Sequence, residues 1–275
     1  MRLIDVRQTY HYTYTDPVQD VRQRLIMVPP DLHGDQVLTC YRLHVEGADA
    51  CDLTWSADEF GNRICHVLAK RVERRLTFEA RYRVQRGTGA APTSMADAHR
   101  YLQSTRLTRS DWRLEAVAAD IAARAATPLE RAERAHTWAA GALLYQVGVT
   151  GVHTAATAAL DVGRGVCQDF AHILLSVLRI LRIPARYVSG HLLGEGVAHA
   201  WVEALVADDA GSHVIAYDPT HNRRVRPEYV TVAVGRDFAD VTPTSGVYTG
   251  AATGILTASK AAALVPEPQD EAAVA

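Results

Sequence analysis

Hydrophobic and polar residues alternate along the first third of the chain. Tyr10, Tyr12 and Tyr14 are separated by threonine and histidine, and this spacing of two predicts a strand with two different faces. Further strand-like runs, divided by proline, glycine and asparagine turn signals, lie at residues 22–28, 36–45, 63–68 and 75–84. Short strands at regular spacing are typical of an antiparallel sandwich. We therefore expect residues 1–85 to form an N-terminal β-sandwich domain.

The pattern changes after residue 85. Residues 86–111 begin with RGTGAAPTSMA, which has no hydrophobic period and predicts a linker. Helical spacing then predicts one helix from about Trp112 to Ala126 and another that continues to about Tyr145. The second helix begins at TPLE, where Thr127 and Glu130 can form a capping box around a proline at the first helical position.

A strongly apolar helix is predicted from Cys167 to about residue 182, closed before Pro184. Three apolar runs follow without intervening helices: ARYVSGHLL, HAWVEALV and HVIAYDPT. Parallel strands would need crossover helices between them, so this order favours an α+β domain with an antiparallel sheet. We expect this domain to span residues 112–250 and the alanine-rich residues 251–275 to form a flexible tail.

Composition excludes several classes of protein. The chain has 275 residues, of which 48% are hydrophobic and 22% charged, which is typical of a globular protein with a full core. The net charge is −2, and lysine and arginine do not cluster with aromatic residues, so no nucleic-acid partner is expected. Neither an apolar leader nor a long uncharged apolar segment is present. We expect a cytoplasmic protein with reduced thiols and no membrane partner; its oligomeric state stays open.

Cys167 is the first candidate for chemistry. In GVCQDFAHILL it stands where a glycine turn becomes a helix, and the positive end of a helix favours a thiolate. A thiol nucleophile needs a base, and the base needs a group that orients it. His199 follows at the start of a predicted strand, 199 − 167 = 32 residues on, and Asp218 lies near the end of the next, 218 − 199 = 19 further. Adjacent antiparallel strands can bring His199 and Asp218 together.

Taken singly, these three residues have ordinary explanations. A lone cysteine on an apolar helix is commonly a small core residue, and a histidine beside alanine and tryptophan is commonly a partly buried one. Asp218 before proline and threonine is a common turn former.

Four segments together carry a resemblance to a known family: GRGVCQDFAH, IPARYVSG, AHAWVEA and YDPTHN. They resemble the bacterial transglutaminase-like proteins of the papain-related superfamily. YHYTYTDPV and DEFGN are similar to that family's N-terminal sandwich domain, and VAVGRDFADVTPTSGVYTG is similar to its C-terminal signature. The resemblance implies a papain-like core, in which a cysteine-bearing helix packs on an antiparallel sheet, behind the sandwich.

The resemblance also implies roles for individual residues. Cys167 would be the nucleophile, His199 the general base and then acid, and Asp218 the carboxylate that orients His199, with no metal and no organic cofactor. The substrate would be a peptide or protein. The Cys167 backbone N–H would be one oxyanion donor, and the second would be Tyr145 or Gln168. The family often has a tryptophan before the catalytic aspartate, and Trp201 or Tyr217 could replace it in the substrate site.

Other interpretations of the same residues stay open. The histidines around Cys167 could bind zinc, although no HExxH or CxxC spacing is present; they are His172, His191, His199, His213 and His221. The chain could also be a non-catalytic binding module built on this fold. Among enzymes, the same residues serve a peptidase or amidase and a protein-glutamine amine transferase. We favour the hydrolase because the chain has nothing similar to the acidic calcium-binding insertions of the animal crosslinking enzymes.

Overall fold

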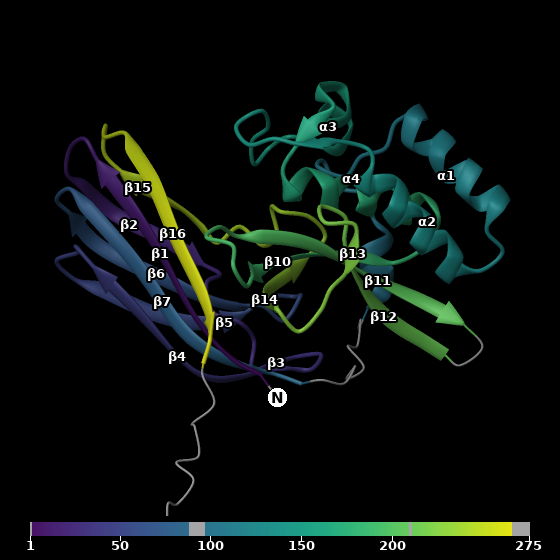
Figure 1. Ribbon diagram of the computed structural model, residues 1–275. Coiled ribbons are helices and arrows are strands. Elements are labelled where there is room, and N and C mark those ends of the chain that lie inside the picture. The colour runs from purple at the N-terminus through teal and green to yellow at the C-terminus, as the bar shows by residue number, and fades with distance from the viewer. Residues whose placement is uncertain (1, 88–96, 209–210, 266–275) are drawn as a thin grey trace, which may run out of the picture.

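The alternating N-terminal residues form the sandwich that the sequence predicts. The computed structural model describes residues 2–87, 97–208 and 211–265, and Figure 1 shows two stacked sheets beside a third sheet that carries the helices. The first sheet has the order β16-β1-β7-β4-β3, with strands Gly254–Leu264, Arg2–Tyr14, Arg75–Arg86, Gln36–Glu46 and Leu32–His33. The second has the order β15-β2-β6-β5, with strands Thr244–Thr249, Val18–Leu25, Arg63–Val72 and Cys51–Ala57. All pairings within these two sheets are antiparallel.

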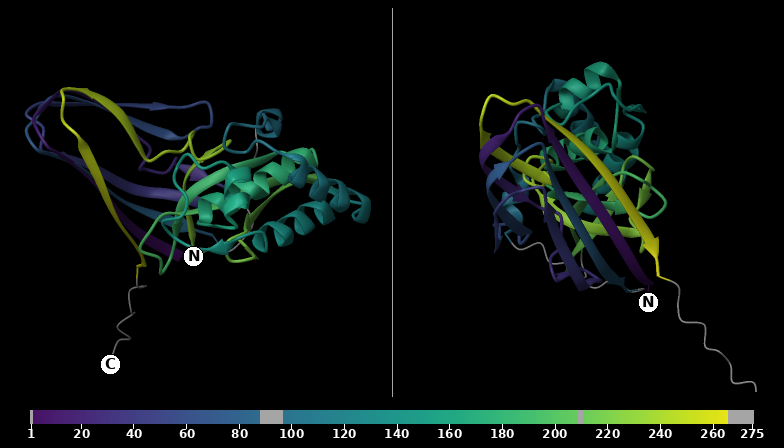
Figure 2. Two further views of the ribbon diagram at one scale, coloured as in Figure 1. Left: turned by 90° about the horizontal axis from the view of Figure 1, so that it is seen from above. Right: turned by 90° about the vertical axis from the view of Figure 1, so that its left-hand side faces the viewer.

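The C-terminal segment differs from the expected flexible tail. Residues 254–264 form β16, which pairs with β1 from Ile4 to Tyr14, and Figure 2 shows the two strands side by side. β15 likewise joins β2, so both sheets of the sandwich contain strands from the C-terminal part of the chain. Alanine-rich β16 exposes most of its side chains and is held by backbone pairing to the edge of β1. Its sequence has no alternation of hydrophobic and polar residues that would predict a strand. Residues 266–275 lie outside the described residues.

The expected linker is partly packed against the helices. Of residues 86–111, 88–96 lie outside the described residues, while Ala98–Leu102 form a short 3₁₀ helix in which Tyr101 is buried. The carbonyl of Tyr101 accepts a hydrogen bond from Arg179 at 3.0 Å. The segment that precedes the first long helix is therefore anchored to the core.

The described residues then include four α-helices: α1 Trp112–Arg124, α2 Pro128–Ala140, α3 Ala156–Val162 and α4 Cys167–Ile180. The capping box of Thr127 and Glu130 forms as predicted. α2 ends at Gly141 rather than near Tyr145, because the chain leaves the helix to make strand β8 (Leu144–Tyr145), parallel to β9 (Arg164–Gly165). Within the described residues, no helix has both the length and the apolar character needed to cross a membrane.

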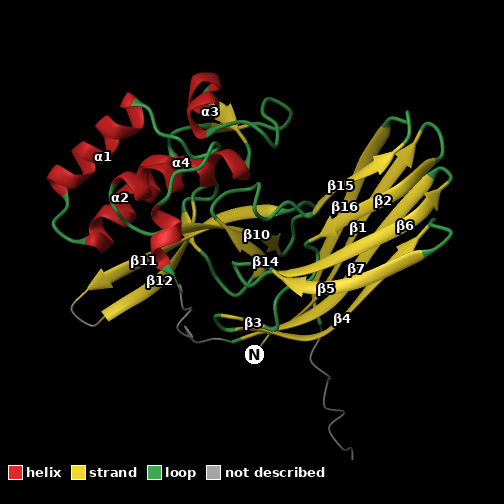
Figure 3. Cartoon of the chain, turned by 180° about the vertical axis from the view of Figure 1, so that it is seen from behind, coloured by secondary structure: helices red, strands yellow, loops and turns green. Residues whose placement is uncertain are grey.

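The third sheet places α4 against antiparallel strands, as expected for a papain-like core. Its order is β13-β12-β11-β10-β14, with strands Arg223–Arg224, Gly211–Asp218, His199–Asp208, Ala185–Leu192 and Tyr229–Gly235. β10, β11 and β12 correspond to the three predicted apolar runs, whereas β13 and β14 were not predicted. The helices gather on one side of this sheet, with the sandwich beside it (Figure 3). α4 is buried on nearly all sides, which explains its continuous apolar sequence.

Two side-chain amides join the sandwich to the third sheet. β14 is an edge strand, so one row of its backbone polar groups needs partners from elsewhere. Gln36 accepts from the Thr231 N–H at 2.8 Å and donates to the Thr231 carbonyl at 2.7 Å. Asn62 makes the same pair of bonds with Val234, at 2.8 Å and 2.7 Å. Both amides are buried and complete the edge of β14 as a neighbouring strand would.

Replacement of Gln36 should destabilise this junction. Gln36→Leu keeps a similar volume but leaves the buried N–H and C=O of Thr231 without partners, so the free energy of unfolding should fall by about 2 kcal/mol or more. Gln19→Leu is the matched control, because Gln19 is exposed on β2. Urea unfolding of both variants measures the difference. Equal stabilities would contradict the role assigned to the Gln36 amide.

Candidate active site

Helix α4 begins at Cys167 because the residues around it fix the preceding turn. The Asp169 carboxylate accepts from the Val166 N–H at 2.8 Å and from the Thr150 hydroxyl at 2.7 Å. A Cβ on Gly165 would lie 2.6 Å from that carboxylate, so only glycine fits there without a shift. The turn therefore presents Cys167, half-buried, as the first helical residue, at the positive end of a well-packed helix.

The short β8–β9 pairing brings Tyr145 to the same turn. The N–H groups of Leu144 and Gln146 donate to the carbonyls of Gly163 and Gly165, at 3.1 Å and 2.9 Å. Tyr145 is 56% exposed. Partial burial and the charges of Cys167 and Glu195 raise the pKa of Tyr145, so its hydroxyl stays protonated at neutral pH.

His199 and Asp218 meet at the ends of adjacent strands. β11 and β12 pair antiparallel, with Val202 opposite Tyr217, which places the first residue of β11 beside the last residue of β12. His199 Nε2 lies 2.8 Å from Asp218 Oδ2. The same imidazole hydrogen-bonds Cys167, whose Sγ lies 4.0 Å from the Ala198 carbonyl oxygen. The structure thus places the three predicted residues in one chain of contacts.

The charges of Cys167, His199 and Asp218 stabilise one another. Burial of His199 opposes its positive charge, but hydrogen bonds and charge interactions with Asp218 and Cys167 outweigh it and raise the pKa of His199 to about 10. Burial of Asp218 opposes its negative charge, but bonds from His199, Tyr229 and His221 hold its pKa well below the ordinary value. The arrangement therefore favours an imidazolium and a carboxylate at neutral pH.

Asp218 has further partners that the sequence did not reveal. Its Oδ2 accepts from the Tyr229 hydroxyl at 2.6 Å and from His221 Nδ1 at 2.7 Å, and its Oδ1 accepts from the N–H groups of Thr220 and His221. The backbone carbonyl of Asp218 accepts from His136 Nε2, on α2, at 3.1 Å. Only the proximity of His221 to Asp218 in YDPTHN gave a signal, since Tyr229 and His136 lie 11 and 82 residues away in the chain.

The remaining predicted residues lie at different depths. Trp201 is 1% exposed and stacks beneath His199 with ring centroids 6.2 Å apart, so it supports the imidazole and does not line an open substrate surface. Tyr217 is fully buried and donates to Glu133 at 3.1 Å. Gln168 is 8% exposed and donates to the Gly151 carbonyl at a long 3.4 Å. Of the two candidate oxyanion donors, Tyr145 is the more accessible.

Four of the five histidines considered for zinc fall into two groups, and the fifth, His213, is exposed on β12. His172 and His191 are buried, and burial lowers the pKa of each to about 3, which marks them as neutral core residues. His199 and His221 instead lie together with Glu195, and their potential ligand atoms are all within 4.8 Å of one another. Within the described residues, this is the one such group of three.

Strand β16 contributes a lysine whose charge interacts with that of Cys167. Lys260 lies opposite Gln8 of β1 and places its Nζ 5.4 Å from the Tyr10 ring centroid. Burial lowers the pKa of Lys260 to about 8, and the charge of Cys167 partly offsets this.

The fold and the contacts of Cys167 define the class of protein: a papain-like core of the transglutaminase type behind an antiparallel sandwich. The chain belongs to the transglutaminase-like superfamily. Residues 115–219 match the family model described as the transglutaminase-like superfamily, and residues 4–85 match the bacterial transglutaminase-like N-terminal region.

Individual proteins are also similar to this chain. An uncharacterized protein of Mycobacterium leprae is 41% identical over 180 residues, which cover 61% of this chain and 62% of that protein. One of Mycobacterium tuberculosis is 33% identical over 128 residues, which cover 42% and 41%. The chain thus matches less than two thirds of the length of these curated relatives. A solved structure from Cytophaga hutchinsonii, described as a candidate cysteine protease, has a TM-score of 0.77 and 21% identity, and covers 97% of this chain and 91% of that one; it shows the shared fold.

The pKa of His199 should depend on Asp218. Asp218→Asn removes the negative charge that outweighs burial, so the pKa of His199 should fall from about 10 towards that of free imidazole. The imidazolium would then lose its proton at a lower pH than in the unaltered chain. NMR titration of the His199 ring measures this. Tyr229→Phe keeps the carboxylate and should give a smaller fall, and an unchanged pKa in Asp218→Asn would contradict the assignment.

Proposed function

We propose that this chain is a cysteine-dependent acyl-transfer enzyme that cleaves peptide or amide bonds through a thioester. Cys167 is the nucleophile, His199 the general base and acid, and Asp218 the residue that orients His199. The activity proposed is that of a peptidase or amidase. Membership of the transglutaminase-like superfamily supports an enzyme of this type, and the description of the Cytophaga hutchinsonii protein agrees with it.

The observation that carries the proposal is the connection from Asp218 through His199 to Cys167. Asp218 Oδ2 accepts a hydrogen bond from Nε2 of His199, which leaves Nδ1 as the nitrogen that can exchange a proton with the thiol. A buried cysteine that only fills space needs no imidazole held by a buried carboxylate. A binding module would need none of these contacts.

Acylation uses the charge separation that this group favours. The Cys167 thiolate attacks the carbonyl carbon of the substrate and forms a C–S bond, and the carbonyl electrons move to the oxygen. The C–N bond then breaks as His199 Nδ1 donates its proton to the leaving amine. A thioester on Cys167 and a neutral His199 remain.

Deacylation reverses the proton transfer. Neutral His199 takes a proton from water through Nδ1 while the water oxygen attacks the thioester carbon. The C–S bond breaks, the carboxylic acid leaves, and Cys167 and His199 return to their starting charges. Throughout both steps Asp218 stays ionised and holds the Nε2 proton, so the imidazole keeps one orientation.

An acceptor amine in place of water would make the same thioester form a new amide bond. Measurement of both products separates the two reactions: free carboxylate from a peptide amide, and incorporation of a labelled primary amine into a glutamine-containing protein. Hydrolysis should be the faster reaction. Faster incorporation of the amine would make the chain a protein-glutamine amine transferase and would leave the roles of Cys167, His199 and Asp218 unchanged.

Replacement of the nucleophile tests the proposal directly. Cys167→Ala should abolish turnover of a peptide-amide library while the chain remains folded, as checked by circular dichroism. Intact-mass spectrometry after treatment with a peptide aldehyde should show one adduct, mapped to Cys167. The exposed Cys40 and Cys51 provide Cys40→Ala and Cys51→Ala controls with full activity. Full turnover by Cys167→Ala would place the chemistry elsewhere.

Tyr145 is the second oxyanion donor in this proposal, because its exposed hydroxyl lies near Cys167. Tyr145→Phe removes only that hydroxyl, so kcat should fall roughly 10²-fold while KM changes little. Steady-state kinetics measure kcat and KM separately. Gln168→Leu should have a smaller effect on kcat, and the opposite ranking would assign the donor role to Gln168.

A further inference from the structure

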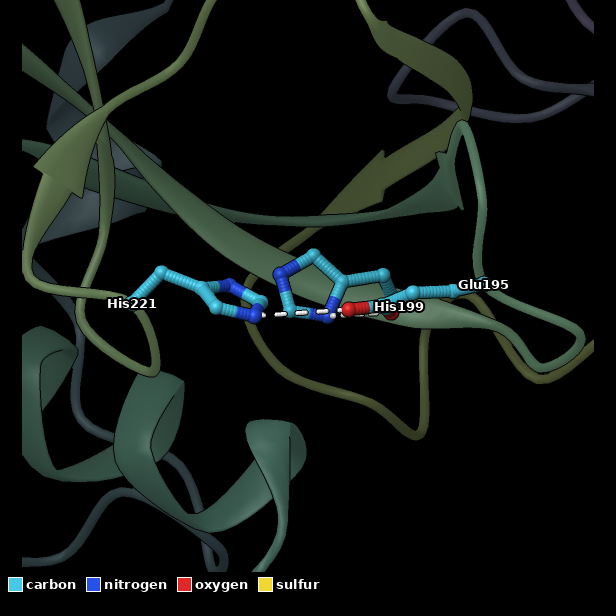
Figure 4. Close-up of side chains that lie close together, drawn as sticks. All are labelled: Glu195, His199 and His221. Atoms are coloured by element: carbon cyan, nitrogen blue, oxygen red, sulfur yellow. Dashed lines mark ion pairs between the residues drawn. The ribbon is translucent and has the colours of Figure 1, made fainter.

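Glu195, His199 and His221 form a compact group that acyl transfer does not fully use (Figure 4). Glu195 comes from the connection between β10 and β11, His199 begins β11, and His221 lies in the turn after β12. Glu195 Oε1 is 3.3 Å from His221 Nε2, and Glu195 Oε2 is 3.6 Å from His199 Nδ1. Glu195 and His221 therefore stand beside the nitrogen that would serve the thiol.

Asp218 fixes the orientation of both imidazoles. Its Oδ2 lies 2.8 Å from His199 Nε2 and 2.7 Å from His221 Nδ1. A carboxylate accepts hydrogen bonds, so each of these nitrogens carries a proton. When the rings are neutral, His199 Nδ1 and His221 Nε2 each carry a lone pair, and both nitrogens lie near the Glu195 carboxylate. Zinc would therefore displace the proton that His199 holds at neutral pH. Histidine ligands of zinc are commonly oriented by a carboxylate in this way.

The two separations that Glu195 makes suit a small tetrahedral ion, and all three potential ligand atoms lie within 4.8 Å of one another. Zinc binds nitrogen and oxygen at about 2.1 Å, so two of its ligands lie about 3.4 Å apart. The separations of 3.3 Å and 3.6 Å that Glu195 makes with the two histidines bracket that value. The side chains of Glu195 and His221 are 30% and 36% exposed, whereas His199 is 2% exposed, so an ion can enter from solvent. Water would complete the fourth position.

We propose that Glu195, His199 Nδ1 and His221 Nε2 form a zinc site through which Zn²⁺ reversibly blocks this enzyme. Bound zinc occupies the Nδ1 lone pair, so His199 can neither accept a proton from Cys167 or water nor return one to the leaving amine. The zinc site is argued from the geometry alone, whereas inhibition by zinc rests on the proposed acyl-transfer function. The ion is an inhibitor here and takes no part in the reaction.

Zinc binding is tested first without any substrate. The full chain is dialysed against a chelator and titrated with ZnCl₂ by calorimetry, and one ion should bind per chain. Glu195→Gln and His221→Gln should each weaken binding at least about 10-fold. His153→Gln and Glu115→Gln are matched controls, since both residues are exposed and lie outside the group, and their affinities should not change. Thermal unfolding without zinc verifies that each variant is folded.

NMR of the histidine rings locates the ion. The ring signals of His199 and His221 should shift together on addition of one equivalent of ZnCl₂, and those of the buried His172 should not. Absence of stoichiometric binding, or unchanged affinity in both Glu195→Gln and His221→Gln, would overturn the site.

Inhibition is measured separately on the active chain. Turnover with and without zinc should give an inhibition constant that rises at least about 10-fold in Glu195→Gln and His221→Gln. If zinc binds and the saturated chain keeps full turnover, the block is refuted and the proposed function stands. If zinc binds with the expected dependence and no turnover is found at any zinc concentration, the proposed function fails and the zinc site stands.

Discussion

The buried carboxylate of Asp218 is the constraint on which the site depends. A buried charge costs several kcal/mol unless polar partners replace water. Asp218 obtains them from two backbone N–H groups of its own turn, the rings of His199 and His221, and the Tyr229 hydroxyl. Each partner that stabilises the carboxylate is itself oriented by it. The direction of the His199 ring, and so the nitrogen presented to Cys167, follows from satisfying this one buried group.

Through Tyr229 the same constraint reaches the sandwich. Tyr229 begins β14, whose outer edge is completed by the amides of Gln36 and Asn62. Valines of β14 also pack into the hydrophobic cluster of the sandwich. The strand that supplies a hydroxyl to Asp218 is therefore held from one side by the N-terminal sheets. The sandwich therefore has a structural role at the site. It fixes the position of the edge strand β14, and with it the Tyr229 hydroxyl that donates to Asp218.

Cys167, His199 and Asp218 could be predicted from the sequence because a local signal at each residue agrees with the resemblance of the surrounding segments to one family. A glycine turn before an apolar helix marks Cys167, and the ends of two successive apolar runs mark His199 and Asp218. The supporting residues carry no such signal, since Tyr229 reaches Asp218 only after the chain has passed through β13. Strand β16 could not be predicted either. Its alanines have little β-propensity and no alternating pattern, and its pairing depends on the free edge of β1, about 250 residues earlier. Helical spacing predicts that α2 continues to about Tyr145, whereas the helix ends at Ala140 and the following residues form β8, which pairs with β9.

Because Asp218 binds two histidines, the site offers His199 Nδ1 a choice of partners. His199 Nδ1 can hold a proton, hydrogen-bond a sulfur or bind a cation, and these uses exclude one another. Asp218 makes the ring more basic, which favours the proton needed for the leaving amine and strengthens the lone pair that a metal would take. Glu195, near the same nitrogen, adds negative charge that stabilises either the imidazolium or a bound cation. The features that would make this imidazole a good acid–base catalyst therefore also make it a good ligand, and His221 supplies the second nitrogen that would distinguish zinc from a proton.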